Sequence, residues 1–378
     1  MYHVKTMNKI SKIGLAELDD RFAISDTMEH EDAILVRSAK LHDYDFPAEL
    51  KCIARAGAGV NNIPLDRAAD AGIVVFNAPG ANANGVKELT IAALLLASRK
   101  ISQGITWVKE QSAAGADVAA VVEKGKSAYV GPEIMGKTLG VVGLGAIGVL
   151  VANAAAALGM KIVGYDPFLS VTHALNLTPG VEVVDTLPEL YAKADYISLH
   201  LPMNDATRGT LNEAAFAAMK DGVRIVNLAR GELVDTPALK AALDSGKCAA
   251  YVTDFPNSET AAMEGVVAIP HLGASTPESE DNCAMMAARE VKEYLDNGSI
   301  INSVNLPNLT MAWAAKTRVC VISKGADAAA IAGAVPAVAS ASNTRGEYAY
   351  TILDTDAAVD EAAIAAIPGV LRVRVLTR

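Results

Sequence analysis

The sequence predicts an α/β protein with a doubly wound parallel sheet and a small C-terminal domain of order βαββαβ. Two observations lead to this fold class. Short apolar runs alternate with helical patterns from residue 33 to residue 297, which is typical of parallel sheets. Residues 317–378 then read as strand, helix, strand, strand, helix, strand, which is the split-βαβ, ferredoxin-like arrangement. The 378 residues are enough for two or three domains.

The composition is that of a globular protein with a substantial core, at 51% hydrophobic and 20% charged residues. The net charge of -10 disfavours nucleic acid or an anionic membrane as a partner, so an anionic substrate needs a local cluster of Arg and Lys. The four cysteines are scattered and the N-terminus lacks an apolar signal segment, so we expect a cytoplasmic protein with reduced thiols. No histidine pair has zinc-binding spacing, so no metal is expected.

The first hundred residues contain three predicted strands, at residues 33–36, 52–54 and 72–76, and a helix from Gly85 onward. Loops at residues 55–62 and 77–84 follow two of these strands. Ligands of open parallel sheets bind beyond the carboxyl ends of the strands. Both loops are therefore candidate substrate loops, with plain turn chemistry as the alternative for each. Residues 101–136 read as helical, with a glycine-broken loop in the middle.

The stretch from Lys137 to Asp166 carries the most specific motif. An apolar run at residues 139–142 leads into Gly143-x-Gly145-x-x-Gly148, then a helix, a second strand and Asp166. This order predicts a dinucleotide site: the first glycine makes the turn, the second lets a pyrophosphate approach, and the third lets the helix pack closely. Asp166 follows the glycine motif at the sequence separation expected for an acid that binds the ribose of NAD. Its carboxylate would repel the 2′-phosphate of NADP.

Two alternatives stand beside this interpretation. The glycines could punctuate a turn that binds nothing. The 23 uncharged residues from Thr138 to Met160 are also long enough to span a bilayer. The glycine fingerprint within this run favours a buried strand and helix instead.

After this motif, strand and helix patterns continue to alternate. Strands are predicted at residues 181–184, 194–201, 224–228, 249–254 and 266–269, and helices at residues 212–219, 236–243 and 277–297. Residues 298–316 are polar and turn-rich, which predicts a linker before the C-terminal domain.

Three polar residues follow strand ends in this region: Arg230, Glu259 and His271. Each alone could be structural or solvated. Together they suit the oxidation of a 2-hydroxy acid, because His can take the hydroxyl proton, a carboxylate can orient the imidazole, and Arg can bind the substrate carboxylate through two hydrogen bonds.

The stretches RAGAGVNNI, VFNAPGANANGVKELT, VVGLGAIG, GYDP, NLARGELVD, DFPNSE and PHLGAST resemble the D-isomer-specific 2-hydroxyacid dehydrogenase family. The resemblance implies two Rossmann-like domains, one inserted in the other. Residues 1–95 and 277–305 would bind substrate and residues 96–276 would bind NAD. Residues 317–378 resemble an ACT domain, a regulatory fold, although the loop at residues 323–327 lacks the usual Pro-Gly turn.

The resemblance also assigns roles. Arg230, Glu259 and His271 would be catalytic. The cofactor would contact Gly143, Gly145, Ala146, Ile147, Gly148, Asp166, Leu201, Leu228, Ala229, Arg230, Asp254, His271 and Gly273. The substrate would contact Arg55, Ala58, Gly59, Asn77, Lys126 and Arg230, with Arg55 and Lys126 meeting a phosphate. The active site would lie between the two Rossmann-like domains.

The activity implied is oxidation of 3-phospho-D-glycerate with NAD, the first step of L-serine biosynthesis. One alternative keeps the chemistry with another substrate, as in a glyoxylate or hydroxypyruvate reductase. Another is an NAD-sensing binding protein without turnover. The resemblance further implies a homodimer or homotetramer.

Overall fold

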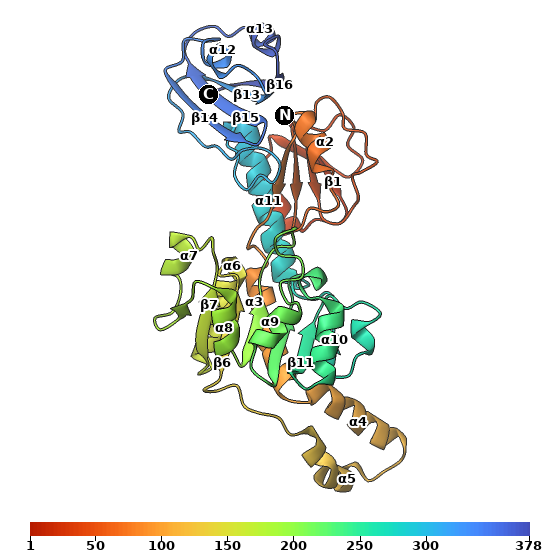
Figure 1. Cartoon of the computed structure of the whole chain (residues 1–378). Helices are drawn as coiled ribbons and strands as arrows, with labels where there is room; N and C mark the ends of the chain where they lie inside the picture. Colours follow the sequence, from red (N-terminus) through yellow and green to blue (C-terminus); the bar gives the residue numbers. More distant parts are fainter. The chain divides into compact units, whose positions relative to one another are not determined.

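The computed structural model describes residues 1–378, which form two compact units (Figure 1). Unit 1 comprises Met1–Asn82 and Pro277–Arg378, and unit 2 comprises Ala83–Thr276. Unit 2 is thus inserted in unit 1 along the sequence.

One boundary differs from the sequence expectation, which kept residues up to 95 with the first domain. Helix α3 (Ala83–Ser98) belongs to unit 2. The reason is its buried face, since Val86 and Leu94 share a hydrophobic core with Leu139 of that unit.

Unit 2 contains a seven-stranded parallel sheet in the order β12-β11-β10-β9-β6-β7-β8. Its strands are β6 (Thr138–Val142), β7 (Lys161–Tyr165), β8 (Glu182–Val183), β9 (Tyr196–Leu199), β10 (Val223–Asn227), β11 (Cys248–Thr253) and β12 (Val266–Ala268). β6 is the first strand of this sheet in chain order. β7 and β8 follow on one side of it, and β9 then pairs with its other side. This is the doubly wound order, and ligands bind where it reverses.

Helices cover both faces of this sheet, because successive side chains of a strand point to opposite sides. Val141 joins a core with α3 and α6, whereas Val142 joins one with α8, α9 and α10. The helices are α6 (Ala146–Ala157), α7 (Val171–Leu175), α8 (Leu187–Lys193), α9 (Glu213–Ala218) and α10 (Thr236–Asp244).

An arm of unit 2 follows α3 and contains α4 (Ile101–Ala113), α5 (Val118–Gly125) and the short helix η1 (Lys126–Tyr129). None of these helices has a buried residue, and the arm projects from the rest of the unit (Figure 1). The rings of Trp107 and Tyr129 pack against each other with their centroids 5.4 Å apart.

Unit 1 contains a five-stranded parallel sheet in the order β2-β1-β3-β4-β5. The strands are β1 (Tyr2–Met7), β2 (Phe22–Ser25), β3 (Ala33–Val36), β4 (Cys52–Arg55) and β5 (Val74–Asn77), with short helices α1 (Lys12–Leu15) and α2 (Leu65–Asp70). The long helix α11 (Pro277–Asn297) covers one face, where the rings of Tyr294 and Phe76 meet edge to face.

The C-terminal part of unit 1 is a four-stranded antiparallel sheet in the order β14-β15-β13-β16. Its elements are β13 (Thr317–Lys324), α12 (Ala328–Ala332), β14 (Ala339–Arg345), β15 (Tyr348–Thr355), α13 (Glu361–Ala365) and β16 (Val370–Thr377). The predicted βαββαβ order is confirmed. One face of this sheet packs on its own helices, and the other contributes Ile322, Tyr350 and Ile352 to the core around α11.

Residues 298–316, expected to be a linker, are held in unit 1 instead. Ile300 and Leu306 are fully buried, and the Val304 amide donates to the Val75 carbonyl of β5 at 2.9 Å. The segment covers the free edge of that strand, which is why it is ordered.

The uncharged run from Thr138 to Met160 folds as β6, the glycine turn and α6. No helix of the structure combines the length and the apolar character that a membrane crossing requires.

Candidate active site

The glycine turn after β6 is built as its motif predicts. Gly143 has φ of +94°, a conformation that favours glycine, and a side chain there would also strike the His200 carbonyl. A Cβ on Gly148 would lie 1.9 Å from the Gly143 oxygen, so this glycine permits close packing of α6. A Cβ on Gly145 would meet nothing within 4 Å. Open space therefore lies beside the first amides of α6, including those of Ala146 and Ile147, which have no partner within the helix.

Asp166 follows β7 and lies against this turn. Its Oδ2 accepts a hydrogen bond from the Leu144 amide, and its Oδ1 accepts one from the Phe168 amide, both at 2.8 Å. Each carboxylate oxygen keeps a second lone pair, so Asp166 can accept further bonds from ribose hydroxyls.

The ends of β9 and β10 meet the same edge of the sheet, because β6 pairs with β9 and β9 with β10. They place Leu201, Leu228 and Ala229 there. His200 lies beside them, where burial lowers its pKa to about 4 and Ser198 Oγ is 2.9 Å from its ring. A histidine whose pKa lies this far below neutral pH is a weak base and therefore a poor candidate for the acid/base.

Arg230 and His271 come together through a residue that the sequence analysis did not single out, Phe255. The Phe255 ring centroid lies 4.4 Å from that of His271 and 5.4 Å from the Arg230 guanidinium carbon. Phe255 follows β11 in the loop DFPNSE, directly after a strand end, and this position is the signal that could have identified it. The buried Asn227 fixes the Arg230 loop, since its Nδ2 donates to the Arg230 carbonyl at 2.8 Å.

Glu259 is not paired with His271 in this structure. It is exposed at the start of the short helix η3 (Thr260–Ala262), and its amide donates to Asn257 Oδ1 at 3.0 Å. No hydrogen bond or ion pair joins its carboxylate to the imidazole. The partnership that the sequence suggested therefore stays a prediction.

Asp254, at the end of β11, is buried and has one unsatisfied oxygen. Its Oδ2 accepts from the Gly273 amide at 3.1 Å, whereas Oδ1 is buried without a hydrogen-bond partner. Burial raises the pKa of this carboxyl, and the Gly273 amide and His271 oppose that effect. A buried acceptor without a donor is costly and indicates a ligand with an N–H group, such as a carboxamide.

In unit 1, the two predicted substrate loops are joined by hydrogen bonds. Asn77 Nδ2 donates to the Ala58 carbonyl at 2.6 Å, and the Ala78 amide donates to the Gly57 carbonyl at 3.0 Å. Arg55 Nε donates to the Arg37 carbonyl at 3.1 Å. The structure thus places Arg55, Ala58, Gly59 and Asn77 at the carboxyl ends of β4 and β5.

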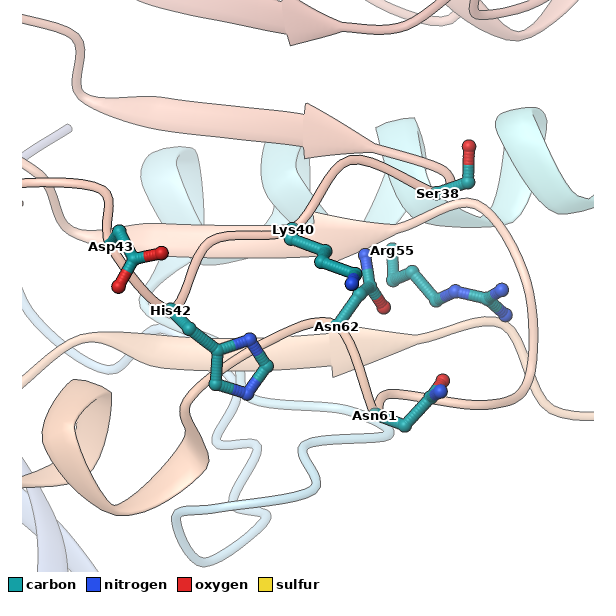
Figure 2. A pocket seen from close by; sticks show the side chains of 7 residues that line it. All are labelled: Ser38, Lys40, His42, Asp43, Arg55, Asn61 and Asn62. Carbon is teal, nitrogen blue, oxygen red and sulfur yellow. The ribbon is translucent and has the colours of Figure 1, made fainter.

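A pocket of about 610 Å³ lies next to Arg55 on the loops that follow β3 and β4 (Figure 2). Its lining combines basic and polar side chains with one acid: Ser38, Lys40, His42, Asp43, Arg55, Asn61 and Asn62. Lys40 and His42 were not among the predicted site residues. They stand on a loop without a glycine motif, so only the pairing of β3 with β4 brings them beside Arg55.

Lys126 lies in unit 2, on η1 of the arm, where its Nζ is 2.6 Å from the exposed carboxylate of Glu123. Its assignment to the substrate stays a prediction.

Residues 91–273 match the family model described as "D-isomer specific 2-hydroxyacid dehydrogenase, NAD binding domain". The chain is 35% identical over 315 residues to the D-3-phosphoglycerate dehydrogenase of Methanocaldococcus jannaschii, a match that covers 81% of this chain and 58% of that protein. The chain spans little more than half the length of the curated relatives that it matches.

Two solved structures are also similar. The NAD+-bound 3-phosphoglycerate dehydrogenase of Entamoeba histolytica is 26% identical, with a TM-score of 0.61, over 82% of this chain and 99% of that one. A glyoxylate reductase of Paecilomyes thermophila is 28% identical, with a TM-score of 0.66, over 80% of this chain and 98% of that one. Enzymes with different substrates share this fold.

The residues present in unit 2 fit NAD. Gly145 leaves room for a pyrophosphate, Asp166 offers acceptors to a ribose, and Asp254 offers a buried acceptor to the nicotinamide carboxamide. All three lie within the matched residues.

Proposed function

We propose, from the premise that this chain carries the NAD-binding domain of the D-isomer specific 2-hydroxyacid dehydrogenase family, that it oxidises 3-phospho-D-glycerate to 3-phosphohydroxypyruvate. This reaction is the first step of L-serine biosynthesis. The observation that carries the proposal is the convergence of Arg230 and His271 on Phe255 within that domain. The names of the curated relatives supply the substrate.

His271, Arg230 and Glu259 are each assigned a separate role in the reaction. NAD, when bound, supplies the hydride acceptor. His271 takes the proton of the C2 hydroxyl as the carbonyl forms, because an exposed imidazole can exchange that proton with water. Arg230 binds the substrate carboxylate and polarises the C2 oxygen. Glu259 is assigned as the carboxylate partner of His271, a contact that would form with substrate present, since catalytic hydrogen bonds are often long without ligand.

Unit 1 is proposed to contribute substrate-binding residues of its own. The amides of the Ala58–Gly59 turn would meet the carboxylate. Arg55, with Lys40 and His42 in the same pocket, would receive the phosphate, since the chain as a whole is acidic and needs such a local cluster.

Steady-state kinetics test the proposal directly. With NADH, the chain should reduce 3-phosphohydroxypyruvate with a higher kcat/KM than glyoxylate. The variant His271→Ala should lose about 100- to 10,000-fold in kcat while NADH still binds. Turnover that survives in His271→Ala would remove the assignment of the acid/base.

A second candidate is a glyoxylate or hydroxypyruvate reductase, which the likeness to the glyoxylate reductase favours. A preference for glyoxylate in the same assay would establish it. Tight NADH binding without turnover of any 2-oxo acid would indicate an NAD-sensing protein instead.

The C-terminal βαββαβ part is proposed to be an ACT-like regulatory domain, an assignment supported by its strand order. The kinetics above, repeated with serine, test whether it regulates this chain. Loss of rate in serine would support the assignment.

The arm of unit 2 is proposed as the surface through which two copies form a homodimer, alone or within a homotetramer. The arm exposes three apolar side chains of α4, namely Ile101, Ile105 and Val108, and a fourth, Val130, directly after η1. Ile105→Glu should shift the mass in light scattering toward the monomer. Val338→Glu, at an exposed apolar residue of the C-terminal part, is the control.

A further inference from the structure

A buried carboxyl group outside the proposed catalytic set lies on α11. Glu290 is 6% exposed, and only one of its oxygens has a partner. Its Oε1 accepts from Asn302 Nδ2 at 2.8 Å, and its Oε2 is buried without a hydrogen bond. A buried, half-satisfied glutamic acid destabilises the fold relative to an apolar residue. Stability alone therefore gives no reason for it.

Asn302 connects Glu290 to the edge of the parallel sheet. Its φ of +58° is a left-handed conformation, which Asn tolerates better than most residues and which turns the chain toward β5. The Asn302 carbonyl then accepts from the Asn77 amide at 3.4 Å, and Ser303 forms an antiparallel bridge with Phe76. The end of β5 is thus held by the segment that Glu290 anchors.

Asn77 connects the end of β5 to the other substrate loop, at residues 55–62. Its side chain donates to the Ala58 carbonyl at 2.6 Å. Three hydrogen bonds in series therefore run from Glu290 to Asn302, from Asn302 to Asn77, and from Asn77 to the turn that presents its amides to the substrate.

We propose that Glu290 is a positioning residue for the substrate loops, acting through Asn302 on Asn77 and so on the turn at Ala58. The inference rests on the proposed function in one respect, namely that these loops bind substrate. Glu290 itself touches no reacting atom in this role.

The protonation of Glu290 follows from its surroundings. Burial raises its pKa to about 8, and the hydrogen bond from Asn302 is the only opposing cause. Helix α11 is packed by α1, β3, β4 and β5 and, at its last turns, by the antiparallel sheet with Arg374 of β16. None of these elements, Arg374 included, places a charged side chain that shifts the pKa of Glu290. At pH 7 the group is therefore mainly neutral. Above pH 8 it ionises in a site where Oε2 has no donor, which favours its movement toward water and the loss of the Asn302 bond.

Glu290→Gln separates positioning from a plain structural role, because glutamine has the shape of the neutral acid and does not titrate. The KM for 3-phosphohydroxypyruvate should rise in the wild-type chain about two- to tenfold as pH passes 8, the range expected for one lost hydrogen bond. In Glu290→Gln the KM should stay low across this range. The control Glu293→Gln removes an exposed carboxylate of the same helix and should follow the wild type. Parallel KM profiles for the wild type and Glu290→Gln would overturn the proposal.

A second measurement does not depend on turnover. In Glu290→Ala, hydrogen–deuterium exchange of peptides covering residues 55–62 and 76–82 should be faster than in the matched variant Glu293→Ala. Unchanged exchange in both peptides would overturn the proposal. Absent turnover in the wild-type chain would count against the proposed function instead, and exchange would still decide the role of Glu290.

Discussion

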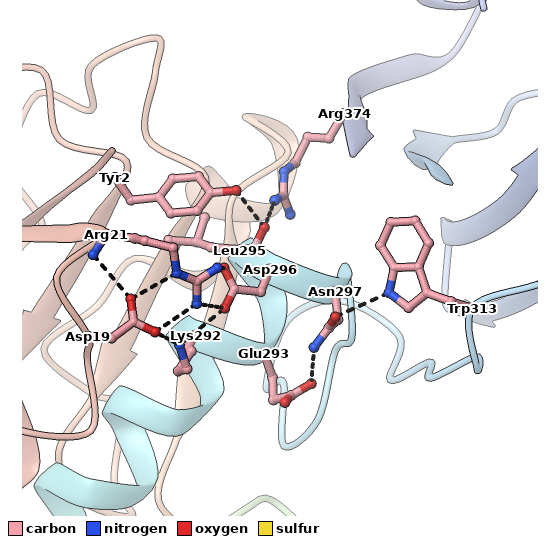
Figure 3. Close-up of polar contacts among 10 residues, drawn as sticks. All are labelled: Tyr2, Asp19, Arg21, Lys292, Glu293, Leu295, Asp296, Asn297, Trp313 and Arg374. Atoms are coloured by element: carbon pink, nitrogen blue, oxygen red, sulfur yellow. Dashed lines mark hydrogen bonds and ion pairs between the residues drawn. The ribbon is translucent and has the colours of Figure 1, made fainter. Parts of the chain in front are cut away.

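The Arg374 guanidinium of β16 donates hydrogen bonds to the carbonyls of Tyr294 and Leu295 in the last turns of α11, each at 2.9 Å. Figure 3 shows the bond to the Leu295 carbonyl. The final carbonyls of a helix lack partners within it and carry its negative dipole end, so a buried cation is well placed there. Tyr350 Oη donates to the Gly298 carbonyl just beyond, at 2.6 Å. The antiparallel sheet thus supplies hydrogen-bond donors to the carboxyl end of α11, the helix that covers the parallel sheet of unit 1.

Replacing Arg374 by Met should lower the free energy of unfolding by about 2–4 kcal/mol, because two buried carbonyls lose a charged donor. Urea denaturation measures the change. Arg378→Met, at an exposed position of the C-terminus, should leave the midpoint within error. Equal midpoints for both variants would mean that the helix end does not need this cap.

Arg318 and Asp354 form a fully buried ion pair within the same sheet, with Nε–Oδ1 at 2.7 Å and Nη2–Oδ2 at 2.9 Å. Removing either partner alone should cost about 3–5 kcal/mol, since the other charge stays buried. The double variant Arg318→Met/Asp354→Leu should cost less than the sum of the two single variants. Strict additivity in denaturation experiments would contradict the coupling.

Substituting alanine at two glycines of the glycine turn should have different effects. Gly148→Ala should unfold or strongly destabilise unit 2, because its Cβ would lie 1.9 Å from the Gly143 oxygen. Gly145→Ala should fold normally, because its Cβ meets no atom of the chain. It should nonetheless weaken NADH binding, since the methyl group enters the space expected for the pyrophosphate. Fluorescence titration with NADH and thermal unfolding measure both effects, and normal NADH affinity in Gly145→Ala would contradict the placement.

Asp254→Ala should weaken NADH binding about tenfold or more, because the carboxamide loses a buried acceptor. Binding of ADP-ribose, which lacks the nicotinamide, should change little. Glu264→Gln, an exposed acid after the same strand, serves as control. An equal loss for both ligands would indicate a general disturbance of unit 2 instead.

The buried Glu290 carboxyl predicts a pH dependence of stability. Its folded-state pKa of about 8 exceeds the usual value of 4.5, so the folded chain holds this proton more tightly than the unfolded chain. The contribution of neutral Glu290 to the free energy of unfolding is fully present below about pH 4.5. It is lost as the pH rises toward 8. Glu290→Gln lacks this titration, so its melting temperature relative to the wild type should rise between these pH values. A constant difference would contradict the prediction.

Helices and strands with strong local patterns were predicted well from the sequence. The strand Ala33–Val36 and the helix Pro277–Asn297 have the predicted bounds, because a continuous apolar run and a long amphipathic period are both local signals. Strands β1 and β2 were missed. In β1 only Val4 is fully buried and most side chains are polar, so its place in the sheet depends on pairing with β3.

Features that depend on short distances along the chain could be predicted from residue order alone. The glycine turn, Asp166 and the strand ends carrying Arg230, Asp254 and His271 follow from residue order, because a strand followed by a helix places its loop at the carboxyl edge.

Contacts between residues far apart in the chain became known from the folded structure. It placed Phe255 against both Arg230 and His271, left Glu259 unpaired, joined Glu290 to Asn77 through Asn302, and set Arg374 on the end of α11. These contacts depend on how sheets and helices pack, and packing partners far apart in the chain leave no periodic signal in one sequence.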